Sequence, residues 1–98
     1  MRAAYLVAYD IAEPKRWRRV YRLLMGHGDP LQLSIFVCWL SLTERKLMEE
    51  KLTTMLNLKE DRLMFAELGS NAAAVSERLV MMGKARTALD APPRWYVV

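Results

Sequence analysis

One acidic residue of this 98-residue sequence stands where it could do chemistry. Asp10 ends an apolar stretch and directly precedes a helix-like segment that is rich in arginine. A carboxylate in that position can bind Mg²⁺, and the cation can in turn bridge to a phosphate and activate a water molecule. Asp10 could equally cap a turn or pair with a neighbouring arginine. The sequence leaves both interpretations open.

The other familiar catalytic motifs are absent from the sequence. It contains a single histidine, His27, and a single cysteine, Cys38. These numbers exclude a zinc cluster and leave no convincing Ser-His or Cys-His pair. There is no Gly-rich phosphate-binding loop either. The remaining candidate for chemistry is therefore a carboxylate.

Basic side chains repeat at helical spacing in the segment that follows Asp10. The opposite faces of such a helix would carry apolar residues (Trp17, Val20, Tyr21 and Leu24) and basic residues (Lys15, Arg18, Arg19 and Arg22). A row of cations suits the repeated charges of nucleic-acid phosphates, although most charged helix faces are simply solvated. No glutamate interrupts this row, so we keep both interpretations.

The hydrophobic pattern predicts the elements that would position these residues. It indicates strands at Ala3–Tyr9, Leu31–Leu40, Arg62–Leu68 and Arg78–Met82, and helices at Lys15–Met25, Thr43–Leu56 and, as a short turn, Ala72–Glu77. The second β segment is long for one strand and could contain a bulge or divide into two strands. Ser41 and Glu44 have the spacing of a capping box. We therefore expect one α+β domain over residues 1–98.

The second β segment places polar and aromatic residues on one face. Gln32, Ser34 and Phe36 alternate with apolar residues and so project from the same side of a strand. They could be strand residues at a subunit interface, or they could line a path for nucleic acid.

The composition favours association with a second subunit. Hydrophobic residues make up 53% of the chain, and a domain of this size buries only about two-thirds of its unfolded surface. Pro92 and Pro93 stiffen a linker before a β-prone tail at 94–98, which needs a sheet edge to dock on. The apolar runs are too short for a membrane span or a signal peptide. With a lone cysteine, the chain is expected to be soluble and cytoplasmic.

Several of these pieces together resemble a known family. They are the strand end Tyr9-Asp10-Ile11, the basic helix from Lys15 to Val20, Gly28, the segment from Gln32 to Cys38, and Leu40-Ser41 before a helix. In this order and spacing they are similar to the second universal CRISPR-associated protein, the small partner of the CRISPR integrase in spacer acquisition. The resemblance covers most of residues 3–56, and more loosely the 78–83 segment and the tail.

The resemblance implies a ferredoxin-like α+β fold, with two main helices packed on an antiparallel sheet, and a homodimer. Asp10 of each chain would face its counterpart near the twofold axis and hold Mg²⁺ or Mn²⁺. Some members of the family cleave RNA or DNA in a metal-dependent reaction. The residues expected to line such a site are Tyr9, Gln32, Ser34 and Phe36. The residues expected to bind nucleic acid are Lys15, Arg16, Arg18, Arg19 and Arg22.

The resemblance also implies a role without catalysis. A member of this family bridges two integrase dimers and holds double-stranded DNA. Residues 84–98 would act as a linker and an exchanging tail, in which Trp95, Tyr96, Val97 and Val98 add a strand to the partner's sheet. The hypotheses are therefore a metal-dependent phosphodiesterase acting on RNA or DNA, a DNA-binding structural adaptor, and a related RNA-cleaving toxin of the same fold. We favour the CRISPR adaptation role.

Overall fold

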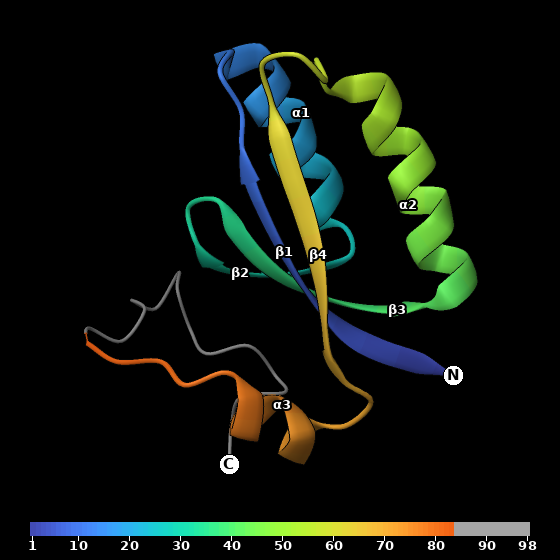
Figure 1. The fold of residues 1–98 in the computed structure, drawn as a ribbon, viewed down its shortest axis with the longest axis vertical. Coiled ribbons are helices and arrows are strands. Elements are labelled where there is room, and N and C mark those ends of the chain that lie inside the picture. The colour runs from blue at the N-terminus through green and yellow to red at the C-terminus, as the bar shows by residue number, and fades with distance from the viewer. Residues whose placement is uncertain (84–98) are drawn as a thin grey trace.

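The computed structural model describes residues 1–83, which form a four-stranded antiparallel sheet with two long helices on one face (Figure 1). The elements in chain order are β1 (Arg2–Asp10), α1 (Pro14–Met25), β2 (Gly28–Gln32), β3 (Ile35–Ser41), α2 (Leu42–Met55), β4 (Arg62–Gly69) and α3 (Ala72–Arg78). The strand order is β2-β3-β1-β4. This β-α-β-β-α-β arrangement is ferredoxin-like and confirms the predicted fold class. No helix in this part of the chain is long and apolar enough to cross a membrane.

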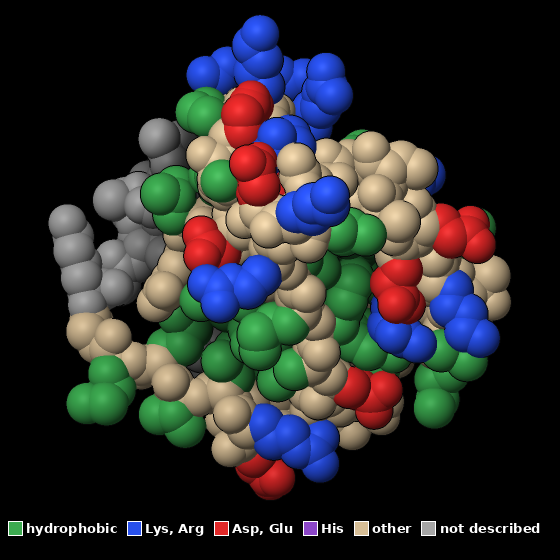
Figure 2. All heavy atoms as spheres, turned by 45° about the horizontal axis from the view of Figure 1, so that its top comes forward, with side chains coloured by type: hydrophobic (Ala, Val, Ile, Leu, Met, Phe, Trp, Pro, Cys, Tyr) green, Lys and Arg blue, Asp and Glu red, His purple; other side chains and the backbone are tan. Residues whose placement is uncertain are grey.

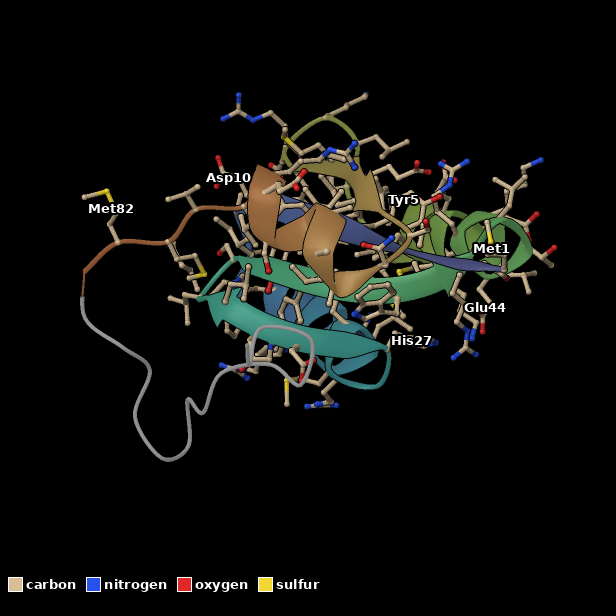
Figure 3. All side chains as sticks on the ribbon, turned by 90° about the horizontal axis from the view of Figure 1, so that it is seen from below. Met1, Tyr5, Asp10, His27, Glu44 and Met82 are labelled. Carbon is tan, nitrogen blue, oxygen red and sulfur yellow. The ribbon has the colours of Figure 1, made fainter. Side chains whose placement is uncertain are left out.

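The central strand β1 is covered by α1 and α2 on one face and partly covered on the other, which explains its nearly continuous apolar sequence. Tyr5, Val7 and Tyr9 belong to the core beneath α1 and α2. Ala4 and Leu6 contribute to a second cluster on the other face, around Val75 of α3. Figure 3 shows α1 and α3 on opposite sides of the sheet. Because successive strand residues point to opposite faces, Asp10 lies on the face away from α1 and α2.

Both long helices begin at well-formed N-caps. The Glu13 side chain accepts hydrogen bonds from backbone N–H groups in the first turn of α1, where Pro14 occupies the first position. The predicted capping box of α2 is confirmed: the Ser41 hydroxyl accepts from the Glu44 N–H at 3.1 Å, and the Glu44 carboxylate accepts from the Ser41 N–H at 2.8 Å. The helices fill the main core with Val20, Leu24, Met48 and Leu52.

The segment predicted as one β element at Leu31–Leu40 is a hairpin. The division into two strands is confirmed, because β2 and β3 pair around a turn at residues 33–34. β2 begins earlier than expected, at Gly28. A side chain there would meet the Val37 carbonyl oxygen and Cys38, so only glycine lets the two strands approach this closely.

The prediction of a strand at Arg78–Met82 is wrong. α3 continues through Arg78, whose guanidinium donates a hydrogen bond to the Leu68 carbonyl oxygen at 2.7 Å. In the described part of the chain, residues 79–82 pair with no strand. Leu79 and Met81 instead pack on the second cluster, so their alternating pattern reflects coverage of the sheet. The predicted linker and tail lie outside the described residues.

Candidate active site around Asp10

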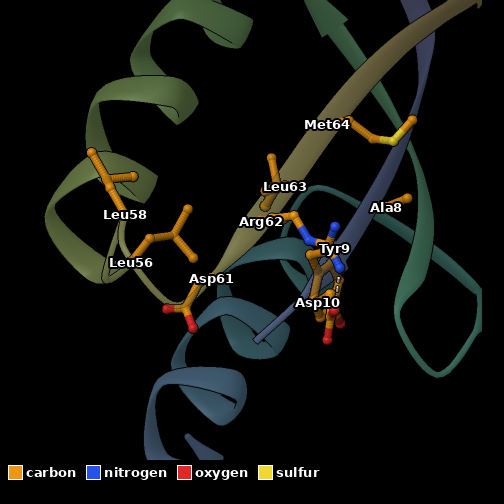
Figure 4. Close-up of a pocket in the computed structure, with 9 residues that line it drawn as sticks. All are labelled: Ala8, Tyr9, Asp10, Leu56, Leu58, Asp61, Arg62, Leu63 and Met64. Atoms are coloured by element: carbon orange, nitrogen blue, oxygen red, sulfur yellow. Dashed lines mark hydrogen bonds and ion pairs between the residues drawn. The ribbon is translucent and has the colours of Figure 1, made fainter. Parts of the chain in front are cut away.

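Asp10 ends β1 as an exposed carboxylate that is paired with an arginine. Its Oδ2 accepts a hydrogen bond from Nη2 of Arg62 at 3.0 Å (Figure 4). Arg62 is the residue directly opposite Asp10 in the β1–β4 pairing. The interpretation in which Asp10 pairs with an arginine is therefore realised, although the partner is 52 residues away in sequence and not on the adjacent helix.

A hollow of about 630 Å³ opens beside this ion pair. Its lining consists mainly of apolar side chains from the ends of β1 and β4 and from the connection after α2: Ala8, Tyr9, Leu56, Leu58, Leu63 and Met64, together with Asp10, Asp61 and Arg62 (Figure 4). The hollow therefore combines an apolar lining with one exposed carboxylate and one exposed guanidinium. A nucleotide also combines an apolar surface, the face of its base, with a charged group, its phosphate.

A buried carboxylate, Asp61, holds the two strand ends together. Its oxygens accept hydrogen bonds from Nε of Arg16 at 2.8 Å, from the Ala12 N–H at 3.0 Å and from the Asn57 N–H at 2.9 Å. The bond from Arg16, assisted by the two backbone bonds and opposed by burial, lowers the pKa of Asp61 to about 2. Because Asp61 directly precedes Arg62, this anchoring supports the pairing of Arg62 with Asp10. The sequence analysis identified neither Asp61 nor Arg62 as a site residue.

The four predicted lining residues do not converge on Asp10. Tyr9 lines the hollow, but it is buried and its hydroxyl donates to the Leu33 carbonyl oxygen at 3.2 Å. Burial, with a smaller contribution from Tyr21, raises the pKa of Tyr9 to about 12. Phe36 is fully buried in the main core.

Within residues 1–83, the side chains of the polar pair, Gln32 and Ser34, make no hydrogen bond to the Asp10 carboxylate. Ser34 sits in the β2–β3 turn, where its carbonyl oxygen accepts from the Tyr9 N–H at 3.1 Å. Gln32 is exposed and lines a different hollow, next to residues 79–82. Only Tyr9 among the predicted lining residues is therefore at the Asp10 hollow.

The predicted nucleic-acid-binding residues fall into two groups. Lys15, Arg18, Arg19 and Arg22 are exposed on α1, and we call them the α1 stripe. Figure 2 shows Lys and Arg side chains gathered along the upper rim of that view. None of the stripe residues lines the Asp10 hollow. Arg16 stands apart, because its guanidinium binds Asp61 and Glu60, and these contacts raise its pKa.

Asp10 is the exposed carboxylate that the hollow offers to a divalent cation. Mg²⁺ is commonly held by one or two carboxylates together with water and phosphate oxygens, so Asp10 is of the right chemical type. Among residues 1–83, no three His, Cys, Asp or Glu side chains lie close enough together to hold a metal ion. The substrate or a second copy of Asp10 could supply further ligands.

The fold and the site together define a small ferredoxin-like protein with an exposed carboxylate at a central strand end and a separate basic helix face. The family model described as CRISPR associated protein Cas2 matches residues 2–74. The chain therefore belongs to the Cas2 family, as the sequence resemblance indicated.

Two relatives illustrate this membership. The chain is 39% identical over 87 residues to CRISPR-associated endoribonuclease Cas2 1 of Rhodospirillum rubrum, covering 89% of this chain and 84% of that protein. It is 36% identical over 84 residues to CRISPR-associated endoribonuclease Cas2 of Geobacter sulfurreducens, covering 86% and 87%.

Two solved structures share the fold. The crystal structure of Streptococcus pyogenes Cas2 at pH 6.5 matches with a TM-score of 0.71 and 30% identity, covering 82% of this chain and 99% of that one. A hypothetical protein from Thermus thermophilus matches with a TM-score of 0.76 and 23% identity, covering 96% and 100%. The second likeness concerns the fold alone.

Proposed function

We propose that this protein is a CRISPR-associated nuclease that cleaves phosphodiester bonds of RNA or DNA in a reaction dependent on a divalent cation and on Asp10. The observation that carries the proposal is the exposed Asp10 carboxylate beside an open hollow. The endoribonuclease names of the relatives support the same reaction class.

Asp10 would hold Mg²⁺ or Mn²⁺, with its counterpart from a second copy or with oxygens of the substrate. The bound cation would supply a water of lowered pKa and neutralise developing negative charge on the phosphate. The Cys38 thiol and the Tyr9 hydroxyl are unsuited to proton transfer or nucleophilic attack at neutral pH. Burial raises the pKa of the Cys38 thiol to about 12, and the Tyr9 hydroxyl is similarly held in its neutral form.

The proposed setting is CRISPR adaptation, with the protein acting as a cytoplasmic homodimer that binds double-stranded DNA together with the CRISPR integrase. The α1 stripe supports DNA binding, because its exposed cations can contact phosphates. The sheet face that carries Asp10 supports dimer formation, because Met64 is 59% exposed there and Leu6 and Ala8 are only half-buried. In the described part of the chain, the outer edge of β4 has no strand partner.

A non-catalytic adaptor is the second candidate. It is favoured by the separation of the α1 stripe from the Asp10 hollow, because DNA could bind along α1 without presenting a bond to the carboxylate. Among residues 1–83, the lack of any group of three metal-ligating side chains points the same way.

Cleavage assays distinguish these candidates. End-labelled RNA and duplex DNA are incubated with the purified protein in Mg²⁺, in Mn²⁺ and in excess chelator. The nuclease proposal expects products with a divalent cation and none with chelator. Tight duplex binding without any cleavage would contradict it and support the adaptor, and cleavage that resists chelator would contradict the role of the cation.

A further inference from the structure

We propose that Arg62 is the phosphate-binding residue of the Asp10 site. In the free protein its guanidinium pairs with Asp10, and on substrate binding it transfers to a phosphodiester oxygen of the nucleic acid. This inference rests on the proposed function, because it assigns Arg62 to the same site.

The first support is the position of Arg62. It lies directly across the β1–β4 pairing from Asp10, so both side chains project from the same face of the sheet. Nη2 reaches Asp10 Oδ2 at 3.0 Å. Among the residues of the described range 1–83 that line the hollow, Arg62 is the single basic one. A phosphate brought to Asp10 would therefore meet this guanidinium first.

The second support is the freedom of the guanidinium to change partner. The Arg62 side chain is 84% exposed and that of Asp10 is 75% exposed. Exposed ion pairs contribute little to stability, so exchanging the carboxylate for another anion costs little. Arginine has five N–H donors, and the bond to Asp10 uses one nitrogen. The planar group matches the geometry of two phosphate oxygens better than a lysine does.

The third support is that the neighbouring charged side chains, Arg16 and Asp61, are already bound to each other. The other basic side chain near this strand end, Arg16, is committed to Asp61 and Glu60, and its departure would leave a buried carboxylate without its cation. Asp61 is likewise occupied by Arg16 and two backbone N–H groups. Asp61 therefore does not compete with Asp10 for Arg62, and Arg16 does not compete with Arg62 for the phosphate. Anchoring by Asp61 keeps the following residue in register with Asp10.

Binding measurements test the inference without any cleavage. Fluorescence anisotropy with a labelled single-stranded RNA in metal-free buffer is measured for four proteins: the natural sequence, Asp10→Asn, Arg62→Ala and the double variant. Removing the charge of Asp10 frees the guanidinium, so Asp10→Asn should bind about threefold to tenfold more tightly. Arg62→Ala should bind more weakly, and the double variant should bind as weakly as Arg62→Ala. A gain from Asp10→Asn that survives in the double variant would overturn the inference.

Kinetics separate this inference from the proposed function. With Mn²⁺ and labelled RNA, Arg62→Ala should lower kcat/KM by roughly 100-fold, and Arg62→Lys should recover part of the loss because it restores the charge without the planar fork. Arg2→Ala is the matched control, since Arg2 is another exposed arginine that pairs with a carboxylate, Glu44, and it lies at the opposite end of β1 from Asp10. Activity of Arg62→Ala equal to that of Arg2→Ala would overturn the inference and leave the proposed function intact. No cleavage by the natural protein would refute the nuclease, and the binding cycle would still decide the role of Arg62.

Discussion

The carboxylate of Asp61 is fully buried and accepts a hydrogen bond from Nε of Arg16 at 2.8 Å. This pair joins α1 to the residue just before β4. Asp61 also accepts from the Ala12 backbone, in the connection that leaves β1. The ends of β1 and β4 are thereby tied to one point, and they carry Asp10 and Arg62. The geometry of the candidate site therefore depends on a residue whose carboxylate is buried and bound to Arg16.

Asp61→Asn should destabilise the protein, because it leaves Arg16 without its buried counter-charge. We expect a melting temperature at least about 10 °C lower at pH 7, measured by circular dichroism. Since the folded-state pKa of about 2 lies below the ordinary value, the stabilisation from Asp61 is complete above about pH 4 and is lost as pH falls towards 2. The natural protein should therefore lose stability over that range, and Asp61→Asn should lose less. Glu60→Gln is the control, since its exposed ion pair should contribute little. Equal melting temperatures for Asp61→Asn and Glu60→Gln would contradict the anchoring role of Asp61.

Gly28→Ala should destabilise the β2–β3 hairpin. The added methyl group would meet the Val37 carbonyl oxygen and Cys38, and we expect a decrease of about 1–3 kcal/mol in the free energy of unfolding. Gly26→Ala is the matched control, because Gly26 has right-handed helical angles and its nearest neighbour would be 3.4 Å away. The control should change stability by less than about 1 kcal/mol. Urea unfolding measures both, and equal effects would show that the close approach at Gly28 is unimportant.

Replacing Arg18, Arg19 and Arg22 by alanine should weaken duplex DNA binding to a similar degree for all sequences. The slope of log affinity against log salt should flatten by about one unit for each phosphate that the protein no longer neutralises. The control variant replaces Lys46, Lys51 and Lys59 by alanine. It removes the same amount of positive charge from other positions on the chain. If both triple variants bind alike, net charge alone explains the binding and the α1 stripe is a solvated face.

The protein should be a dimer at micromolar concentration, because the sheet face around Met64 remains partly uncovered within residues 1–83. Light scattering measures the mass directly. Deleting residues 94–98 should shift the equilibrium markedly towards monomer, and Met64→Lys should do the same by placing a charge on the apolar face. A monomeric full-length chain would contradict the dimer.

Much of the fold follows from local sequence, but the site depends on long-range register. The apolar run before Asp10 and the Ser41–Glu44 capping box correctly predicted β1 and the start of α2, because burial and capping leave local patterns. The pairing of Asp10 with Arg62 has no such pattern, since it arises only when β1 and β4 come together. Alternation could not show that Phe36 faces the main core, because the pattern gives two strand faces without saying which one the helices cover.

The role of Asp10 is tested most directly by comparing RNA cleavage by the natural protein and by Asp10→Asn, purified identically and assayed in Mn²⁺. Asp29→Asn is the control, because it makes the same substitution on the edge strand β2, which β3 separates from β1. We predict that Asp10→Asn loses at least about 99% of the cleavage rate while keeping its fold and binding RNA at least as tightly as the natural protein, and that Asp29→Asn cleaves normally. Equal cleavage by Asp10→Asn and the natural protein would contradict the assignment of Asp10 as the residue on which the chemistry depends.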